Sequence, residues 1–243
     1  LEAFAPQPSY YSWATRAEVL MVRGGAADAV ESALKNALRY APGDDAKLTT
    51  LTQLSHINAG HPALKVLRPG PILHYAGHMI SAPDQAEGRI LARHEAVLKD
   101  RIDAALDAIA PSLVVGSIAS GSDILIVEKA LKMGVRAEVF IPFHDRDFHR
   151  ESIQRAGADW ALRARACLDH DLSSVVHMTR DRYIPDHGEA FAACSRRAMG
   201  AAILTARRKR AEARQLVVWD GVVTKGSAGA DADRRLWASA VGG

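Results

Sequence analysis

A loop rich in small residues, between positions 113 and 123, has the composition of a ligand site. An apolar run, Leu113-Val-Val, is followed by a mixture of glycine and serine and then by a segment with helical periodicity. Glycine lets a ligand approach the backbone, serine offers hydroxyl donors, and the free N–H groups at a helix start suit a phosphate. Asp123 can instead cap the helix or bind a ribose hydroxyl. The positions of this predicted site are Gly116, Ser117, Ser120, Gly121, Ser122 and Asp123. The alternative is a tight strand-to-helix turn that binds nothing, since the loop has neither a Walker A sequence nor GxGxxG.

Three further candidates follow apolar runs that we expect to be strands. Gly77-His78 follows the first run, Pro142-Phe143 the third and Asp220-Gly221 the last. His78 can contact a phosphate or act as a general acid–base, or it can simply pack or cap the turn. His74 lies inside the first run, so we expect a packed, hydrogen-bonded side chain.

The segment His144-Asp-Arg-Asp-Phe-His149 is dense in imidazoles and carboxylates, which are ligands for zinc and other divalent metals. Short clusters of this kind often lack the required geometry, so we predict a solvated loop and no metal. His144 or Arg146 could touch a ligand phosphate from the rim. Cys167 and Cys194 have apolar neighbours and are expected to be buried, inert thiols.

No catalytic residue is assigned. An enzyme acting on a glycosidic bond would need a carboxylate as nucleophile or general acid–base. The candidates are Asp123, Glu128, Asp147 and Glu189. Tyr183 is a further residue that could reach the pocket, and no Ser-His-Asp set can be assigned because the G-x-S-x-G turn is missing.

Strands and helices must alternate from residue 71 onward to position these residues. The expected strands are 72–76, 113–115, 137–141, 174–178 and 215–219, and the expected helices are 88–109, 123–133, 159–168, 189–210 and 230–240. The helix 88–109 should bury Ile90, Val97 and Leu98, among others, and Trp219 should be core. This alternation predicts an α/β fold with a Rossmann-like parallel sheet of about five strands and helices on both faces. In such sheets ligands bind beyond the carboxyl ends of the strands, where all the candidates above are placed.

The first 60 residues show only helical patterns and no strands. Small and apolar residues recur at helical spacing over 12–57, with breaks at Gly24-Gly25 and Pro42-Gly43. This region resembles one tetratricopeptide repeat, and an ordinary helical hairpin is the alternative. We expect a helical region at 1–60 that ends a longer array, a proline- and glycine-rich linker at 61–70, and a ligand-binding domain at 71–243.

Composition excludes several classes of protein. The chain has 243 residues, 48% of them apolar and 24% charged, with a formal charge of +3, which is typical of a globular protein. No apolar run is long enough for a membrane helix, and two cysteines favour a reducing cytoplasm. The basic run at 207–210 has no interleaved aromatic residues and does not favour nucleic acid. The absence of an initiator methionine suggests a piece of a longer protein.

Three segments together resemble a known family. Ile72-Leu-His-Tyr-Ala-Gly-His78, Gly116-Ser-Ile-Ala-Ser-Gly-Ser-Asp123 and Val139-Phe-Ile-Pro-Phe143 occur in the order and context found in the SLOG superfamily, the group related to DprA and the LOG proteins. The resemblance covers about residues 71–223. The helical region in front and Val-Trp-Asp-Gly221 look like bacterial proteins that join a tetratricopeptide or TRAF-binding-type region to such a domain.

This resemblance implies a pocket for a nucleotide or nucleotide-derived small molecule, with no cofactor required. Our first hypothesis is a non-enzymatic sensor whose helical region couples to a protein partner. The second is an enzyme that hydrolyses or transfers an N-glycosidic bond, although Leu125 stands where the phosphoribohydrolase branch has its glutamate. The third is an interaction scaffold with a degenerate pocket.

Overall fold

The computed structural model describes residues 8–186 and 188–241 and divides the chain into two compact units, 1–69 and 70–243. Each unit has its own hydrophobic core. The boundary falls at the end of the segment expected to be a linker. In the described part of the chain, no helix is long and apolar enough to cross a bilayer.

Over residues 8–69, the part of the first unit that the structure describes, there are three α-helices and a short 3-10 helix. Their bounds are α1 (Tyr10–Val22), α2 (Ala27–Leu38), α3 (Asp44–Asn58) and η1 (Pro62–Val66). Leu34, Leu54 and Leu64 are among the fully buried side chains of this core. Leu64 belongs to the segment whose prolines predicted a linker, so that segment also contributes to packing. The expected succession of helices is confirmed, whereas its membership of the tetratricopeptide family stays a prediction.

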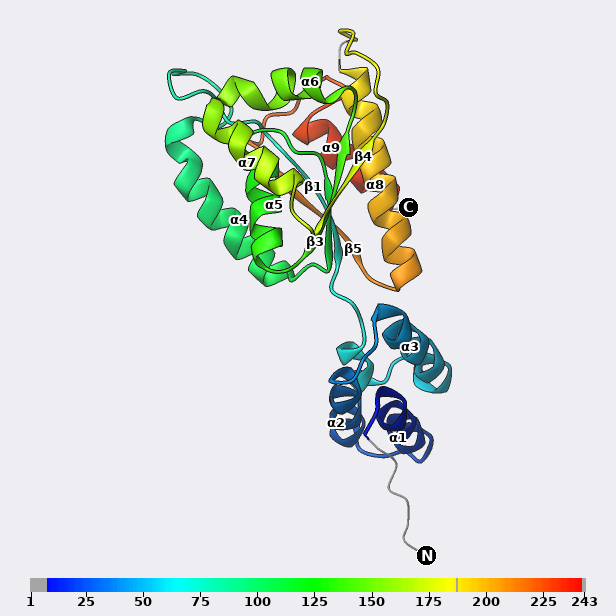
Figure 1. The fold of residues 1–243 in the computed structure, drawn as a ribbon. Coiled ribbons are helices and arrows are strands. Elements are labelled where there is room, and N and C mark those ends of the chain that lie inside the picture. Colours follow the sequence, from blue (N-terminus) through cyan, green and yellow to red (C-terminus); the bar gives the residue numbers. More distant parts are fainter. Residues whose placement is uncertain (1–7, 187, 242–243) are drawn as a thin grey trace, which may run out of the picture. The chain divides into compact units, whose positions relative to one another are not determined.

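The described part of the second unit contains a five-stranded parallel sheet, as predicted, and its strand order is β4-β3-β2-β1-β5 (Figure 1). The strands are β1 (Ile72–Gly77), β2 (Leu113–Gly116), β3 (Arg136–Ile141), β4 (Ser173–His177) and β5 (Ala213–Val218). The longer helices are α4 (Glu95–Ile109), α5 (Ser122–Lys132), α7 (Ala158–Leu168), α8 (Glu189–Lys209) and α9 (Ala230–Val241). A short α6 (Asp145–Phe148), a π-helical turn (His149–Ile153) and a 3-10 turn (Gln154–Ala156) connect β3 to α7.

Both faces of this sheet are covered. Helices α4, α5 and α7 lie on one side and α8 and α9 on the other (Figure 1). Because side chains alternate along a strand, Leu73 and Tyr75 of β1 join the core under α5, whereas Ile72 packs on the α8 side. The register Ile72↔Leu113 and Ile72↔Ala213 aligns β1 with its neighbours β2 and β5, so their carboxyl ends reach the same edge of the sheet.

Three sequence predictions about these elements are wrong. The helix expected from residue 88 begins only at Glu95, after a 3-10 turn at 92–94, because the preceding segment bonds elsewhere: Ser81 N donates to Ile90 O at 2.8 Å. Val97, expected in the core, is 57% exposed. Trp219 is only partly buried and lies beyond the end of β5, where its indole N–H donates to Val222 O.

Candidate functional site

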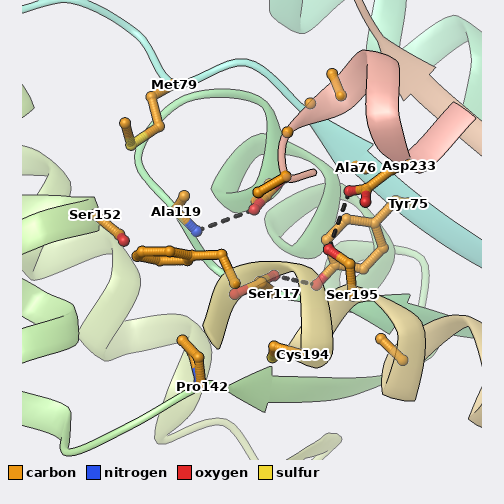
Figure 2. Close-up of a pocket in the computed structure, with 18 of the residues that line it drawn as sticks. Tyr75, Ala76, Met79, Ser117, Ala119, Pro142, Ser152, Cys194, Ser195 and Asp233 are labelled. Atoms are coloured by element: carbon orange, nitrogen blue, oxygen red, sulfur yellow. Dashed lines mark hydrogen bonds between the residues drawn. The ribbon is translucent and has the colours of Figure 1, made fainter. Parts of the chain in front are cut away.

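A cavity of about 390 Å³ lies at the carboxyl edge of the sheet, on the side covered by α8 and α9 (Figure 2). Its walls come from the ends of β1 and β2, the loop that follows β2, Pro142 after β3, the π-helical turn, α8 and the start of α9. The volume falls within the range of roughly 300–1,000 Å³ that is usual for small-molecule sites. Ligands of parallel sheets bind beyond the carboxyl ends of the strands, and the cavity lies at that edge.

Asp123 is the central polar group of this cavity. It lies in the first turn of α5 and is only 6% exposed. Its Oδ2 accepts a hydrogen bond from the backbone N–H of Ala119 at 3.1 Å, which closes the loop onto the helix. Within the part of the chain that the structure describes, Oδ1 is buried without a hydrogen-bond partner. Burial raises the pKa of this carboxyl to about 7, with the nearby Asp233 adding to the rise.

Asp233 is a second buried carboxylate in the same cavity and is not among the residues predicted from the sequence. It comes from the first turn of α9, is 6% exposed, and accepts a hydrogen bond from Ser195 Oγ of α8 at 3.1 Å (Figure 2). Burial raises its pKa to about 6. The sequence signal that could have found it is weak, since an acid at a helix start is favourable without any ligand.

His74 contributes a neutral ring to the cavity wall. The side chain is 1% exposed, stacks on Trp237 with ring centroids 5.6 Å apart, and lies 3.2 Å from the Gln215 amide. Burial lowers its pKa to about 3. The expectation that His74 is a packed, hydrogen-bonded side chain is confirmed.

Charged side chains of opposite sign meet at the rim. Arg155 lines the cavity and forms an ion pair with Glu151, which also accepts a hydrogen bond from Arg150 at 2.9 Å. The Arg155 side chain is 66% exposed, so part of its guanidinium faces solvent. Among the described lining residues Arg155 is the one side chain with a permanent positive charge.

Five of the ten predicted site residues line this cavity, and five do not. The lining ones are Gly77, Gly116, Ser117, Asp123 and Pro142.

His78, the first of the other five, belongs to a neighbouring groove of about 290 Å³. There its Nε2 lies 3.2 Å from Asp220 Oδ1, and Arg89 donates to the other carboxylate oxygen at 2.8 Å. The remaining four are Ser120, Gly121, Ser122 and Phe143.

Ser120, Gly121 and Ser122 hold the loop in place rather than line the cavity, and Phe143 belongs to a separate aromatic cluster. Ser120 is buried, and its backbone N–H donates to Ser152 O at 2.8 Å. Ser122 Oγ donates to the carbonyl of His78 at 2.9 Å. Phe143 is buried against Tyr183, with ring centroids 4.3 Å apart. The hydroxyl of Ser122, predicted as a donor for a ligand, is used in this structure to join the start of α5 to the residue that follows β1.

The glycines of the predicted site have a packing role that the sequence did not indicate. A Cβ on Gly116 would lie 2.6 Å from the Tyr75 ring, and one on Gly77 would lie 2.4 Å from Ser122 Cβ. Gly121 has φ +102° and brings its backbone close to Ile80. Close approach of protein to protein, rather than of ligand to protein, explains the absence of side chains here.

Three of the four carboxylates proposed for catalysis lie outside the cavity. Glu128 is paired with Arg163 at 2.7 Å, and Glu189 is exposed. Asp147 is held by Arg182, which lowers the pKa of this carboxyl well below its usual range. Tyr183 also lies outside, stacked on the aromatic cluster behind the cavity. The structure therefore leaves Asp123 as the candidate among these four.

The remaining sequence candidates have structural partners. His144 accepts the backbone N–H of Arg146, and Asp145 Oδ1 lies 2.6 Å from Nε2 of His177 in β4. Within the described residues no three His, Cys, Asp or Glu side chains converge as a metal site. Both cysteines are buried and unpaired, as expected, and burial raises the pKa of each thiol to about 12. Cys194 nevertheless forms part of the cavity wall.

The fold and the cavity define an α/β protein with a Rossmann-like parallel sheet and a pocket at its carboxyl edge. In comparisons with known proteins, the chain matches no family model, and no curated protein or solved structure is significantly similar to it. The SLOG resemblance therefore stays a prediction that depends on the three short segments quoted above.

Proposed function

We propose that residues 70–243 bind a nucleotide or a nucleotide-derived small molecule in this cavity. The observation that carries the proposal is Asp123, whose side chain lines a cavity of about 390 Å³ at the carboxyl edge of a parallel sheet and whose buried Oδ1 has no hydrogen-bond partner among the described residues. A buried acceptor without a donor is costly to the free protein, and a ligand donor would satisfy it. The SLOG resemblance supports the nucleotide class.

The helical unit gives this proposal its second part. A ligand that orders the loop after β2 would shift the protein toward one conformation, and the helical unit would couple that change to a protein partner. This describes a sensor without catalytic activity. A pure scaffold is less well supported, because the cavity is open enough for a ligand and is not filled by the side chains of the loop.

The test is a binding screen of the full chain by ligand-observed proton NMR against NAD, ADP-ribose, AMP and cyclic nucleotides. Ala119 lines the cavity, and replacing it by leucine would fill part of the space without removing its backbone hydrogen bond to Asp123. We expect line broadening with the natural chain and with Ala119→Ser, and its loss with Ala119→Leu. Equal broadening in all three chains would place the ligand elsewhere, and no broadening would leave the scaffold as the better hypothesis.

A second function is favoured by the same carboxylate. Asp123 lines the cavity, its buried Oδ1 has no hydrogen-bond partner among the described residues, and its pKa of about 7 suits proton transfer near neutral pH. It could serve as nucleophile or general acid–base in the hydrolysis or transfer of an N-glycosidic bond. The NMR samples distinguish the two functions after a night at 25 °C. Signals of free base that grow in the natural chain and not in Asp123→Asn would support the enzyme, and unchanged spectra would support the sensor.

A further inference from the structure

The charges that line the cavity restrict which end of a ligand can enter it. Asp123 and Asp233 are both buried there, and His74 is neutral. The described lining residue with a permanent positive charge, Arg155, is mostly exposed at the rim. A phosphate placed deep in the cavity would therefore meet two carboxylates and no cation, which is unfavourable in a poorly solvated space.

The start of α5 does not change this conclusion. Free N–H groups at a helix start attract anions, but here the carboxylate of Asp123 already lies in the first turn. Its Oδ2 accepts the N–H of Ala119, a donor that the loop could otherwise present to a ligand. The phosphate position predicted from the glycine- and serine-rich loop is thus occupied by an acidic side chain of the protein itself.

The buried end of the cavity instead needs hydrogen-bond donors. Asp123 Oδ1 is an acceptor without a partner in the described chain, and Asp233 lies close enough for its charge to act on Asp123. Ser195, which donates to Asp233, adds a hydroxyl on the α8 side (Figure 2). A hydroxyl group both donates and accepts, so vicinal hydroxyls can pair with these carboxyls in either protonation state.

We propose that the buried end of the cavity binds the 2′- and 3′-hydroxyl groups of a ribose, with Asp123 Oδ1 as acceptor, and that a phosphate lies outward beside Arg155. This proposal rests on the proposed function, since it takes the ligand to be a nucleoside derivative. It assigns a binding role to Asp123 and places Asp233 and Ser195 beside the sugar, and it reverses the orientation that the loop sequence predicts.

The test compares analogues on the full natural chain by titration calorimetry. The probes are the four ribonucleosides and their monophosphates, together with the 2′-deoxy, 3′-deoxy and 2′,3′-dideoxy forms of whichever base binds most tightly. We expect about a tenfold loss of affinity when one paired hydroxyl is removed, since each leaves a buried acceptor unsatisfied. This comparison needs no variant, so a folding defect cannot obscure it.

Two variants then locate the groups. Asp123→Asn should reduce the ratio of ribonucleoside to deoxyribonucleoside affinity toward one. Arg155→Ala should reduce the ratio of monophosphate to nucleoside affinity, with Arg165→Ala, an exposed arginine outside the cavity lining, as the matched control. If ribo and dideoxy forms bind equally, the ribose assignment is overturned while the proposed function stands. If none of the ribonucleosides or monophosphates binds, the ribose assignment is overturned, and if NAD, ADP-ribose and the cyclic nucleotides also show no line broadening, the proposed function is overturned with it.

Discussion

Replacing Asp123 by asparagine should change the free energy of unfolding in a pH-dependent way. The difference between the variant and the natural chain should favour the variant more at pH 8 than at pH 5. The carboxyl is buried, and burial raises its pKa from 3.8 to about 7. Between these two values the folded protein holds a proton that the unfolded chain has released. The free energy of unfolding of the natural chain therefore falls as pH rises through this window and becomes level above about pH 7.

The magnitude follows from those two pKa values. Between strongly acidic solution and pH 8, this one group lowers the free energy of unfolding by roughly 4 kcal/mol. About 1.7 kcal/mol of that decrease has occurred when the pH reaches 5. Asparagine has nearly the same shape, does not titrate, and can still accept the N–H of Ala119. The difference in stability between variant and natural chain should therefore grow in favour of the variant by about 3 kcal/mol between pH 5 and pH 8.

The assay is urea unfolding at four pH values, followed by tryptophan fluorescence. The chain has four tryptophans, and Trp13 is the one in the helical unit, so Trp13→Phe in both proteins restricts the signal to the α/β unit. A second variant, Asp123→Ala, removes the charge and also leaves the Ala119 N–H without its partner. It should be less stable than Asp123→Asn by about 1–3 kcal/mol at every pH. A difference between the natural chain and Asp123→Asn that stays constant with pH would refute the assignment of a raised pKa to a buried Asp123.

Three other outcomes follow from packing. Gly116→Ala should lower the free energy of unfolding by about 1–3 kcal/mol, because its Cβ would lie 2.6 Å from an aromatic ring. Gly200→Ala, which has open space around it inside α8, should raise the free energy of unfolding by about 0.5–1 kcal/mol. Melting temperatures that change in the same direction for both variants would contradict this. Arg163→Ala should cost about 1–3 kcal/mol in urea unfolding, since this side chain joins two acids and stacks on an indole, and Arg163→Lys should recover less than half. Cys167 and Cys194 should react with a thiol reagent at pH 8 only after urea is added, and rapid reaction of the folded protein would show that they are accessible.

The strands and most helices could be predicted because their signals are local. Short apolar runs such as Leu113–Val115 are bounded by glycine, proline or polar residues, and the observed strands begin and end within two residues of the predicted bounds. In the segment before α4, the local sequence pattern predicts the wrong structure. Its apolar spacing is helical, but Ile90 instead pairs with Ile80 in an isolated bridge, so the helix begins later. That pairing is a contact between two segments of the chain, and the periodicity of apolar residues along the sequence does not predict such contacts.

The glycine- and serine-rich loop was predicted correctly as a strand-to-helix connection and only in part as a site. Residue types cannot tell a glycine that admits a ligand from one that admits a neighbouring side chain. At Gly116 the neighbour is Tyr75, whose ring occupies the position where a Cβ would lie and whose hydroxyl donates to Ser117 O at 2.6 Å. The same small residue is thus required by the packing of two strands, whether or not a ligand binds beside it.

Asp233 shows why the rest of the site lay beyond the sequence. In the chain it is one of two acids in the first turn of the last helix, where a carboxylate is favoured by the helix dipole and needs no other explanation. The packing of α9 against α8 and β1 is what removes it from water and brings it to the cavity that Asp123 reaches from α5. A carboxylate becomes a binding group here through burial and not through its residue type. The sequence can therefore indicate candidate acids, but the helices that cover the sheet determine which of these carboxyls are buried away from water. The pH dependence of the stability difference between Asp123→Asn and the natural chain measures the effect of that burial on Asp123.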